Sequence, residues 1–185
     1  MDSSEVNKRI KRVIKPFLLA NGFTINTSRN FWKQNDENIF VVNFQSFNSY
    51  NANVMDVTTF SFSINLGIYW TKLPHIRKLK EKSGFTMPEE VDCTIRHSLK
   101  KNLRQSETSI NNVWFVDKEG KNLDNVIDDA LISLEKFSPE WFKNLSDKRN
   151  CLKFLQKAEE DMQGTFGFGN KNSPRRNFLI GYFSY

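Results

Sequence analysis

The segment FSFSINLGIYW, residues 60–70, decides the fold class of this 185-residue chain. Its alternate residues are large and apolar: Phe60, Phe62, Ile64, Leu66, Ile68 and Trp70. Because successive side chains of a strand point to opposite faces of a sheet, this alternation predicts a strand with one face in a core. The intervening residues are small or polar, so the second face faces water, a helix or a ligand.

The segments before this strand also favour β-structure. Strands are predicted over residues 23–27, 31–34 and 39–47, and polar turn residues separate them. Strands joined by short polar connections form an antiparallel meander. A later strand over residues 91–99 would bring the sheet to about five strands. Residues 48–55 and 71–88 are predicted to be loops or irregular structure.

Helical periodicity marks both ends of the chain. Apolar residues from Val6 to Leu18 form one stripe, which Gly22 is expected to end, and Pro16 predicts a bend near Arg12–Pro16. A set of helices is predicted after the strands: 124–137, one from Ser138, 148–162 and one from Ser173. The order of helix, strands and helices predicts a single α+β domain over residues 1–185, with helices covering the apolar face of the sheet.

Charge, cysteine content and hydrophobicity indicate which partners and which compartment to expect. The chain carries 27 Lys and Arg against 21 Asp and Glu, a net charge of +6 that favours acidic partners. It holds two cysteines, Cys93 and Cys151, in no paired motif, which is typical of reduced thiols. The charged N-terminus and the lack of a 20-residue apolar run predict a cytoplasmic protein without a membrane segment.

The polar face of the predicted sheet is the first candidate site. If the strand over residues 39–47 pairs with the quoted one, amides and hydroxyls gather on one face. The candidate binding residues are Asn43, Gln45, Ser61, Ser63, Asn65 and Tyr69. Such a face is either an ordinary solvated side of an antiparallel sheet or the floor of a recognition groove.

Basic residues form the second candidate. They fall into three groups: the first helix, residues 72–82 and residues 96–104. Nucleic-acid binding would require these groups to converge in space. Arg96 and Lys100 are the candidate contacts, and Arg175 and Arg176 would serve an anion near the glycine-rich stretch 164–172.

Catalysis and metal binding have little support in the sequence. No recognised catalytic motif is present, so an enzyme would need a scattered site with perturbed pKa values. On a regular strand Cys93, Ile95 and His97 would share one face, but a zinc site needs further ligands. We therefore expect no metal and no cofactor.

An ordered set of short motifs carries a family resemblance. The motifs are Lys15-Pro16, Gly22-Phe23, Asn43-Phe44-Gln45, Asn65-Leu66-Gly67, Arg96, Trp114-Phe115 and NFLIGYFSY at residues 177–185. Together they resemble the bacterial domain of unknown function family 4304, although Phe115 stands where that family would have Trp. The resemblance implies an α+β fold and a bacterial source, and it implies no activity.

The sequence thus predicts a non-enzymatic binding module that uses its polar sheet face for a protein partner. An immunity-like or antitoxin-like role is one specific form of this hypothesis. Nucleic-acid binding through the basic groups is the alternative, and an enzyme with a scattered site is the third.

Overall fold

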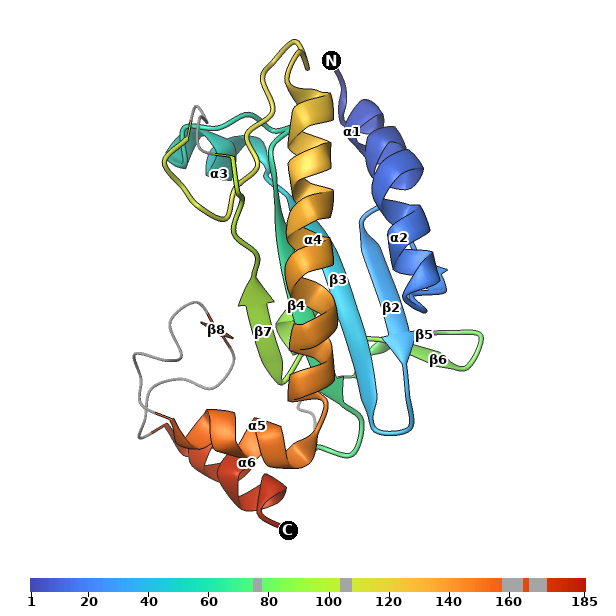
Figure 1. The fold of residues 1–185 in the computed structure, drawn as a ribbon, viewed down its shortest axis with the longest axis vertical. Coiled ribbons are helices and arrows are strands. Elements are labelled where there is room, and N and C mark those ends of the chain that lie inside the picture. Colours follow the sequence, from blue (N-terminus) through green and yellow to red (C-terminus); the bar gives the residue numbers. More distant parts are fainter. Residues whose placement is uncertain (75–77, 104–107, 158–164, 167–172) are drawn as a thin grey trace.

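The computed structural model describes residues 1–74, 78–103, 108–157, 165–166 and 173–185. An antiparallel sheet forms the centre of the molecule, with strand order β1-β2-β3-β4-β7-β8 (Figure 1). The strands are β1 Ile25–Asn26, β2 Asn30–Gln34, β3 Asn38–Ser46, β4 Phe62–Trp70, β7 Ile95–Ser98 and β8 Thr165–Phe166. Strands β1 to β4 pair with their sequence neighbours, which confirms the predicted meander.

Helices cover one face of this sheet, called here the inner face. A β-hairpin and a short 3-10 helix lie over the opposite, outer face. The helices on both sides of the sheet are α1 Ser3–Arg9, π-helical η1 Ile10–Ile14, α2 Lys15–Ala20, α3 Ser49–Val54, 3-10 helix η2 Glu90–Asp92, α4 Leu123–Leu145, α5 Lys148–Gln156 and α6 Pro174–Phe183. A separate hairpin joins β5 Lys80–Lys82 to β6 Phe85–Met87. The α+β class is confirmed, with the N-terminal helix and α4 side by side across the inner face (Figure 1).

The alternation in β4 has the predicted consequence. Phe62, Ile64 and Leu66 have no exposed surface and belong to the main core beneath the helices. On the outer face, Tyr69 joins Val41 and other residues in a second, smaller core that the β5–β6 hairpin covers. The outer face is therefore apolar and covered at one end, and polar nearer the other.

A π-helical turn accommodates Pro16 in the N-terminal helix. Lys15 donates its backbone N–H to Ile10 O, a five-residue step, and the proline that follows has no N–H to donate. The helix ends as predicted: Phe23 N donates to Leu18 O at 3.0 Å, and Gly22 adopts a φ of 86°. This ending turns Phe23 back toward the main core.

The prediction of two separate helices around Ser138-Pro139 is wrong. A single helix, α4, runs from Leu123 to Leu145 with Pro139 inside it. Ser138 does not cap a new helix, because its hydroxyl donates to Leu134 O at 2.8 Å within the same helix. The buried Phe142 and Leu145 continue the apolar stripe beyond the proline and hold the helix on the sheet.

Three short elements differ from the sequence prediction. Helix α3 replaces the loop expected at residues 48–55, with the Asn48 side chain accepting from Asn51 N as its N-cap. The β5–β6 hairpin occupies part of the segment expected to be irregular. The strand expected over residues 91–99 begins only at Ile95, because residues 90–92 form η2.

Candidate functional site

A polar row crosses four strands on the outer face. The register aligns Asn30 of β2, Asn43 of β3, Asn65 of β4 and Ser98 of β7 as direct neighbours. Asn43 Nδ2 donates to Asn30 Oδ1 at 2.7 Å, and Ser98 Oγ donates to Asn65 Oδ1 at 2.6 Å. The row is uncharged and held in place by its own hydrogen bonds.

A second, shorter row adjoins the first. Gln45 of β3 lies opposite Ser63 of β4, and Asn65 Nδ2 donates to Gln45 Oε1 at 2.9 Å. Asn65 is only 5% exposed and Ser63 6%, whereas Gln45 is exposed. The amides of Asn65 and Gln45 thus form a linked surface whose outermost member is Gln45. We call the residues Asn30, Asn43, Gln45, Ser63, Asn65 and Ser98 the polar patch.

The structure brings four of the six predicted binding residues into this patch and leaves two outside it. Ser61 precedes β4 and is fully buried, where its hydroxyl accepts from Val116 N at 3.1 Å. Tyr69 lies in the second core, and burial raises the pKa of its phenol. Asn30 and Ser98 were missed, because cross-strand register decides their membership.

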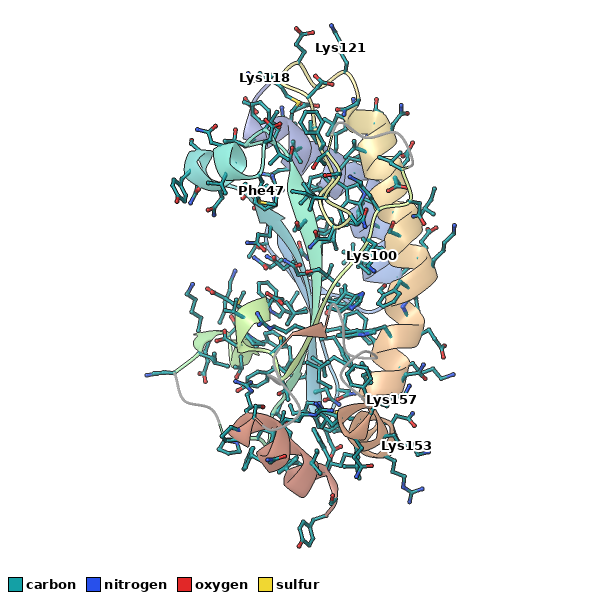
Figure 2. All side chains as sticks on the ribbon, turned by 90° about the vertical axis from the view of Figure 1, so that its left-hand side faces the viewer. Phe47, Lys100, Lys118, Lys121, Lys153 and Lys157 are labelled. Atoms are coloured by element: carbon teal, nitrogen blue, oxygen red, sulfur yellow. The ribbon has the colours of Figure 1, made fainter. Side chains whose placement is uncertain are left out.

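Two short elements on the outer-face side of the sheet carry exposed apolar side chains. Tyr50 and Val54 on α3 are 75% and 69% exposed, and Val91 on η2 is 58% exposed. Figure 2 shows the sheet nearly edge-on, with α4 on one side and α3 on the other. Cys93, which follows η2, packs over Gly67 of β4 and so fixes that segment on the outer face. The patch therefore lies between two projections that each carry exposed apolar surface.

The three basic groups lie on different parts of the molecule. The N-terminal helix packs on the inner face, the β5–β6 hairpin packs on the outer face, and Arg96 lies on β7. Several members also have acidic neighbours: Arg9 with Asp124, Lys80 with Glu89, and Arg96 with Glu90. Lys100 follows β7 as an exposed side chain (Figure 2). Among the described residues, the sheet separates the group on the N-terminal helix from the other two, so the three groups do not form one basic surface there.

The two candidate arginines of α6 are placed differently. Arg175 is exposed, but Arg176 is only 2% exposed. Arg176 Nε donates to Leu155 O at 2.8 Å and its Nη2 donates to Lys157 O at 2.6 Å, so it binds the end of α5. Arg176 therefore ties α6 to α5 and does not present its guanidinium to an anion in solvent. The glycine-rich stretch 164–172 lies outside the described residues apart from the backbone of residues 165–166.

Cys93 and His97 do not share a face, which corrects the sequence prediction. Cys93 precedes β7 and faces the outer core, whereas His97 faces the helices and stacks on Phe137 with ring centroids 4.5 Å apart. Burial, and then the nearby charge of Lys100, lowers the pKa of His97 to about 4. Across the described residues, no group of three or more His, Cys, Asp or Glu side chains is arranged to hold a metal ion.

Comparison with known proteins assigns the family. The model of a domain of unknown function (DUF4304) matches residues 14–144, which cover strands β1 to β7, α2 and nearly all of α4. The chain therefore belongs to this family. The match ends before α6, so the resemblance seen in the last nine residues lies outside it. No curated protein and no solved structure matched the chain.

The described helices do not meet the length and hydrophobicity that a membrane span requires. Each of them is too short or too polar to cross a bilayer.

Proposed function

We propose that this protein is a non-enzymatic binding module and that the polar patch is the contact surface for a protein partner. The observation that carries the proposal is the row Asn30–Asn43–Asn65–Ser98, which crosses four strands between α3 and η2 and contains two hydrogen-bonded side-chain pairs. Rigid amides and hydroxyls offer donors and acceptors at fixed positions, at little cost in side-chain entropy on binding. An immunity-like or antitoxin-like role, with a toxin as the partner, is one specific form of this proposal.

The surroundings of the patch favour a protein over a small ligand. Helix α3, on the outer-face side of the sheet, exposes the apolar side chains Tyr50 and Val54, and aromatic side chains are enriched in protein interfaces. The patch contains no charged side chain that would hold a phosphate or a carboxylate. The net charge of +6 would speed the approach of an acidic partner without fixing the site of contact.

The test compares matched variants in the cells that naturally produce the protein. Gln45→Arg places a charge on the patch, and Tyr50→Ala removes the exposed ring of α3. Gln156→Arg and Tyr185→Ala make the same changes at exposed positions on α5 and at the C-terminus. We expect at least one protein to co-purify with the wild type and with both controls, and roughly tenfold less of it with each patch variant.

Equal recovery of every co-purified protein with patch and control variants would refute the proposal. A complex that nuclease treatment dissolves would identify the partner as nucleic acid instead. Circular dichroism of Gln45→Arg and Tyr50→Ala separates loss of binding from loss of the fold, because both side chains are exposed.

A further inference from the structure

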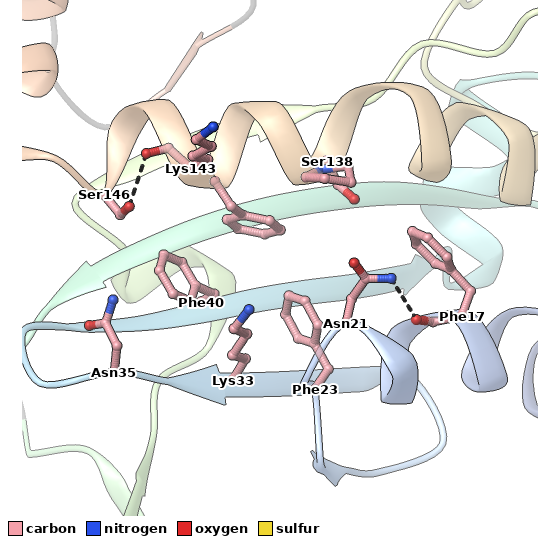
Figure 3. Close-up of a pocket in the computed structure, with 11 residues that line it drawn as sticks. Phe17, Asn21, Phe23, Lys33, Asn35, Phe40, Ser138, Lys143 and Ser146 are labelled. Atoms are coloured by element: carbon pink, nitrogen blue, oxygen red, sulfur yellow. Dashed lines mark hydrogen bonds between the residues drawn. The ribbon is translucent and has the colours of Figure 1, made fainter.

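A second surface lies on the inner face, away from the polar patch. A pocket with a volume of about 270 Å³ opens between α2, β2 and α4 (Figure 3). Its lining residues are Phe17, Asn21, Phe23, Lys33, Asn35, Phe40, Ser138, Pro139, Phe142, Lys143 and Ser146. All of them except Ser146 lie within the segment that the family model matches.

Aromatic rings form the apolar part of the pocket. Phe142 meets Phe40 edge to face with centroids 5.2 Å apart, and it meets Phe23 at 5.6 Å. Such tilted pairs present ring faces and edges to which a further flat ring adds favourably. The turn at Gly22 carries Phe23 into this cluster, and Phe17 completes it from α2.

Lys33 brings a cation into this aromatic surface. It is the only charged side chain among the inner-face positions of β2, β3 and β4, all of which the structure describes. Its side chain packs close to Gly22, and its Nζ lies 6.0 Å from the centre of the Phe40 ring. In this partly apolar setting an anion would be attracted to the Lys33 ammonium group more strongly than in water.

A second cation and several amide groups complete the pocket. Lys143 lies on α4 across the pocket from Lys33 (Figure 3), and no Asp or Glu is among the lining residues. Asn35 Oδ1 accepts from Glu37 N and Asn38 N, which leaves its amide nitrogen as a donor. Asn21 Nδ2 donates to Phe17 O, which leaves its oxygen as an acceptor. Positive charge and donors therefore border the aromatic cluster on two sides.

We propose that this pocket binds small aromatic carboxylates. The aromatic ring of the ligand would pack among Phe23, Phe40 and Phe142, and its carboxylate would lie between the ammonium groups of Lys33 and Lys143. The volume suits a molecule somewhat larger than benzene, since an apolar cavity of about 150 Å³ holds benzene alone. An aromatic acid satisfies the rings and the cations together, whereas a neutral ring leaves both ammonium groups without an anion.

The probe for this site is 4-fluorophenylacetate, and its binding to the full chain is measured by fluorine NMR. Its neutral counterpart, 2-(4-fluorophenyl)ethanol, keeps the ring and lacks the charge. We expect the acid to bind at least about tenfold more tightly than the alcohol. Backbone amide shifts should change most at Phe23, Phe40 and Phe142.

Lysine variants test the charge directly. Lys33→Met and Lys143→Met keep the apolar stem of each side chain, and each should weaken binding of the acid roughly three- to tenfold. Lys153→Met on α5 makes the same change at an exposed site outside the pocket and should bind like the wild type. Thermal unfolding of each variant confirms that the fold is retained.

Three results on affinity would overturn the proposal. They are equal affinity for acid and alcohol, unchanged affinity in the Lys33→Met variant, and no binding of the acid below about 10 mM. Amide shifts centred on the polar patch would likewise place the ligand elsewhere. Because the two sites lie on opposite faces of the sheet, each of these results leaves the proposed partner-binding function to its own test.

Discussion

Gly67 is the residue at which β4 comes closest to the segment that covers the outer face. A Cβ atom at this position would lie 2.5 Å from Cys93 Sγ and 2.9 Å from Cys93 Cβ. Neither distance is compatible with normal packing, so the absence of a side chain here lets the chain before β7 lie flat on the sheet. The second core depends on this close approach.

We therefore predict that Gly67→Ala lowers the free energy of unfolding by about 1–3 kcal/mol through overpacking. Removing the sulfur in Gly67→Ala/Cys93→Ala should recover part of that loss, because the nearest atom in the clash is gone. Urea denaturation of the wild type, both single variants and the double variant measures this coupling. Strictly additive effects would show that the two residues do not share the constraint.

At the scale of elements, the sequence predicted best where periodicity was long. The alternation from Phe62 to Trp70 identified β4 and its inner face, because a buried face requires this period. Pro139 misled the prediction of α4. The local signal of Ser138-Pro139 resembles a helix start, but the buried Phe142 and the hydrogen bond within the helix outweigh it. Short elements such as α3 had no periodicity from which to be found.

The contact between β7 and α4 gives a pH dependence. His97 stacks on Phe137 of α4, and burial lowers its pKa to about 4, against about 6.5 in an unfolded chain. Between about pH 6.5 and pH 4, His97 therefore binds a proton in the unfolded state but not in the folded state. The stability that neutral His97 contributes is lost as the pH falls through this range. We expect about 1–2 kcal/mol of loss from this residue between pH 7 and pH 5.

The His97→Phe variant isolates that contribution. It keeps a ring against Phe137 but cannot take up a proton, so its stability should fall less than that of the wild type between pH 7 and pH 5. Urea denaturation at each pH supplies the comparison. An identical loss in both proteins would mean that other groups, such as the carboxylates, carry the whole dependence.

At the scale of the whole molecule, two of the three hydrophobic clusters of the described residues, the main core and the outer core, share one sheet. Cys93 lies in the outer core and Cys151 in the main core, and both are free and buried. Burial raises the pKa of both thiols, so little reactive thiolate forms in the folded protein. The shared strands predict that the two cores unfold together as a single domain.

Thiol labelling tests this cooperativity. We expect a disulfide reagent at pH 8 to modify neither cysteine in the native protein, and to modify both at the same urea concentration that removes the circular dichroism signal. Cys93→Ala and Cys151→Ala assign the two reactions. Full labelling of Cys93 well below the main transition would show that the outer core opens on its own.

The candidate sites were predicted less completely than the fold. Strand parity in the sequence places Asn43 on the same face as Gln45, and Ser63 on the same face as Asn65, and the pairing of β3 with β4 brings the two pairs together. The additions of Asn30 and Ser98 depend on register across β2 and β7, which no local pattern specifies. The pocket around Lys33 and Lys143 brings residues from four elements together, so only the packing of α4 against β2 reveals it.

The shortness of β1 leaves part of β2 without a neighbouring strand on that side among the residues that the structure describes. Its two residues pair only with Phe31 and Trp32, so the backbone of β2 beyond Trp32 gains no partner from β1. An open edge of this kind invites a strand from another molecule and, through it, aggregation. Lys33 is the first residue of that open stretch, and a strand added there would have to pass beside its ammonium group. We therefore expect the charge of Lys33, the lysine that we propose for ligand binding, to disfavour edge-to-edge association at this position.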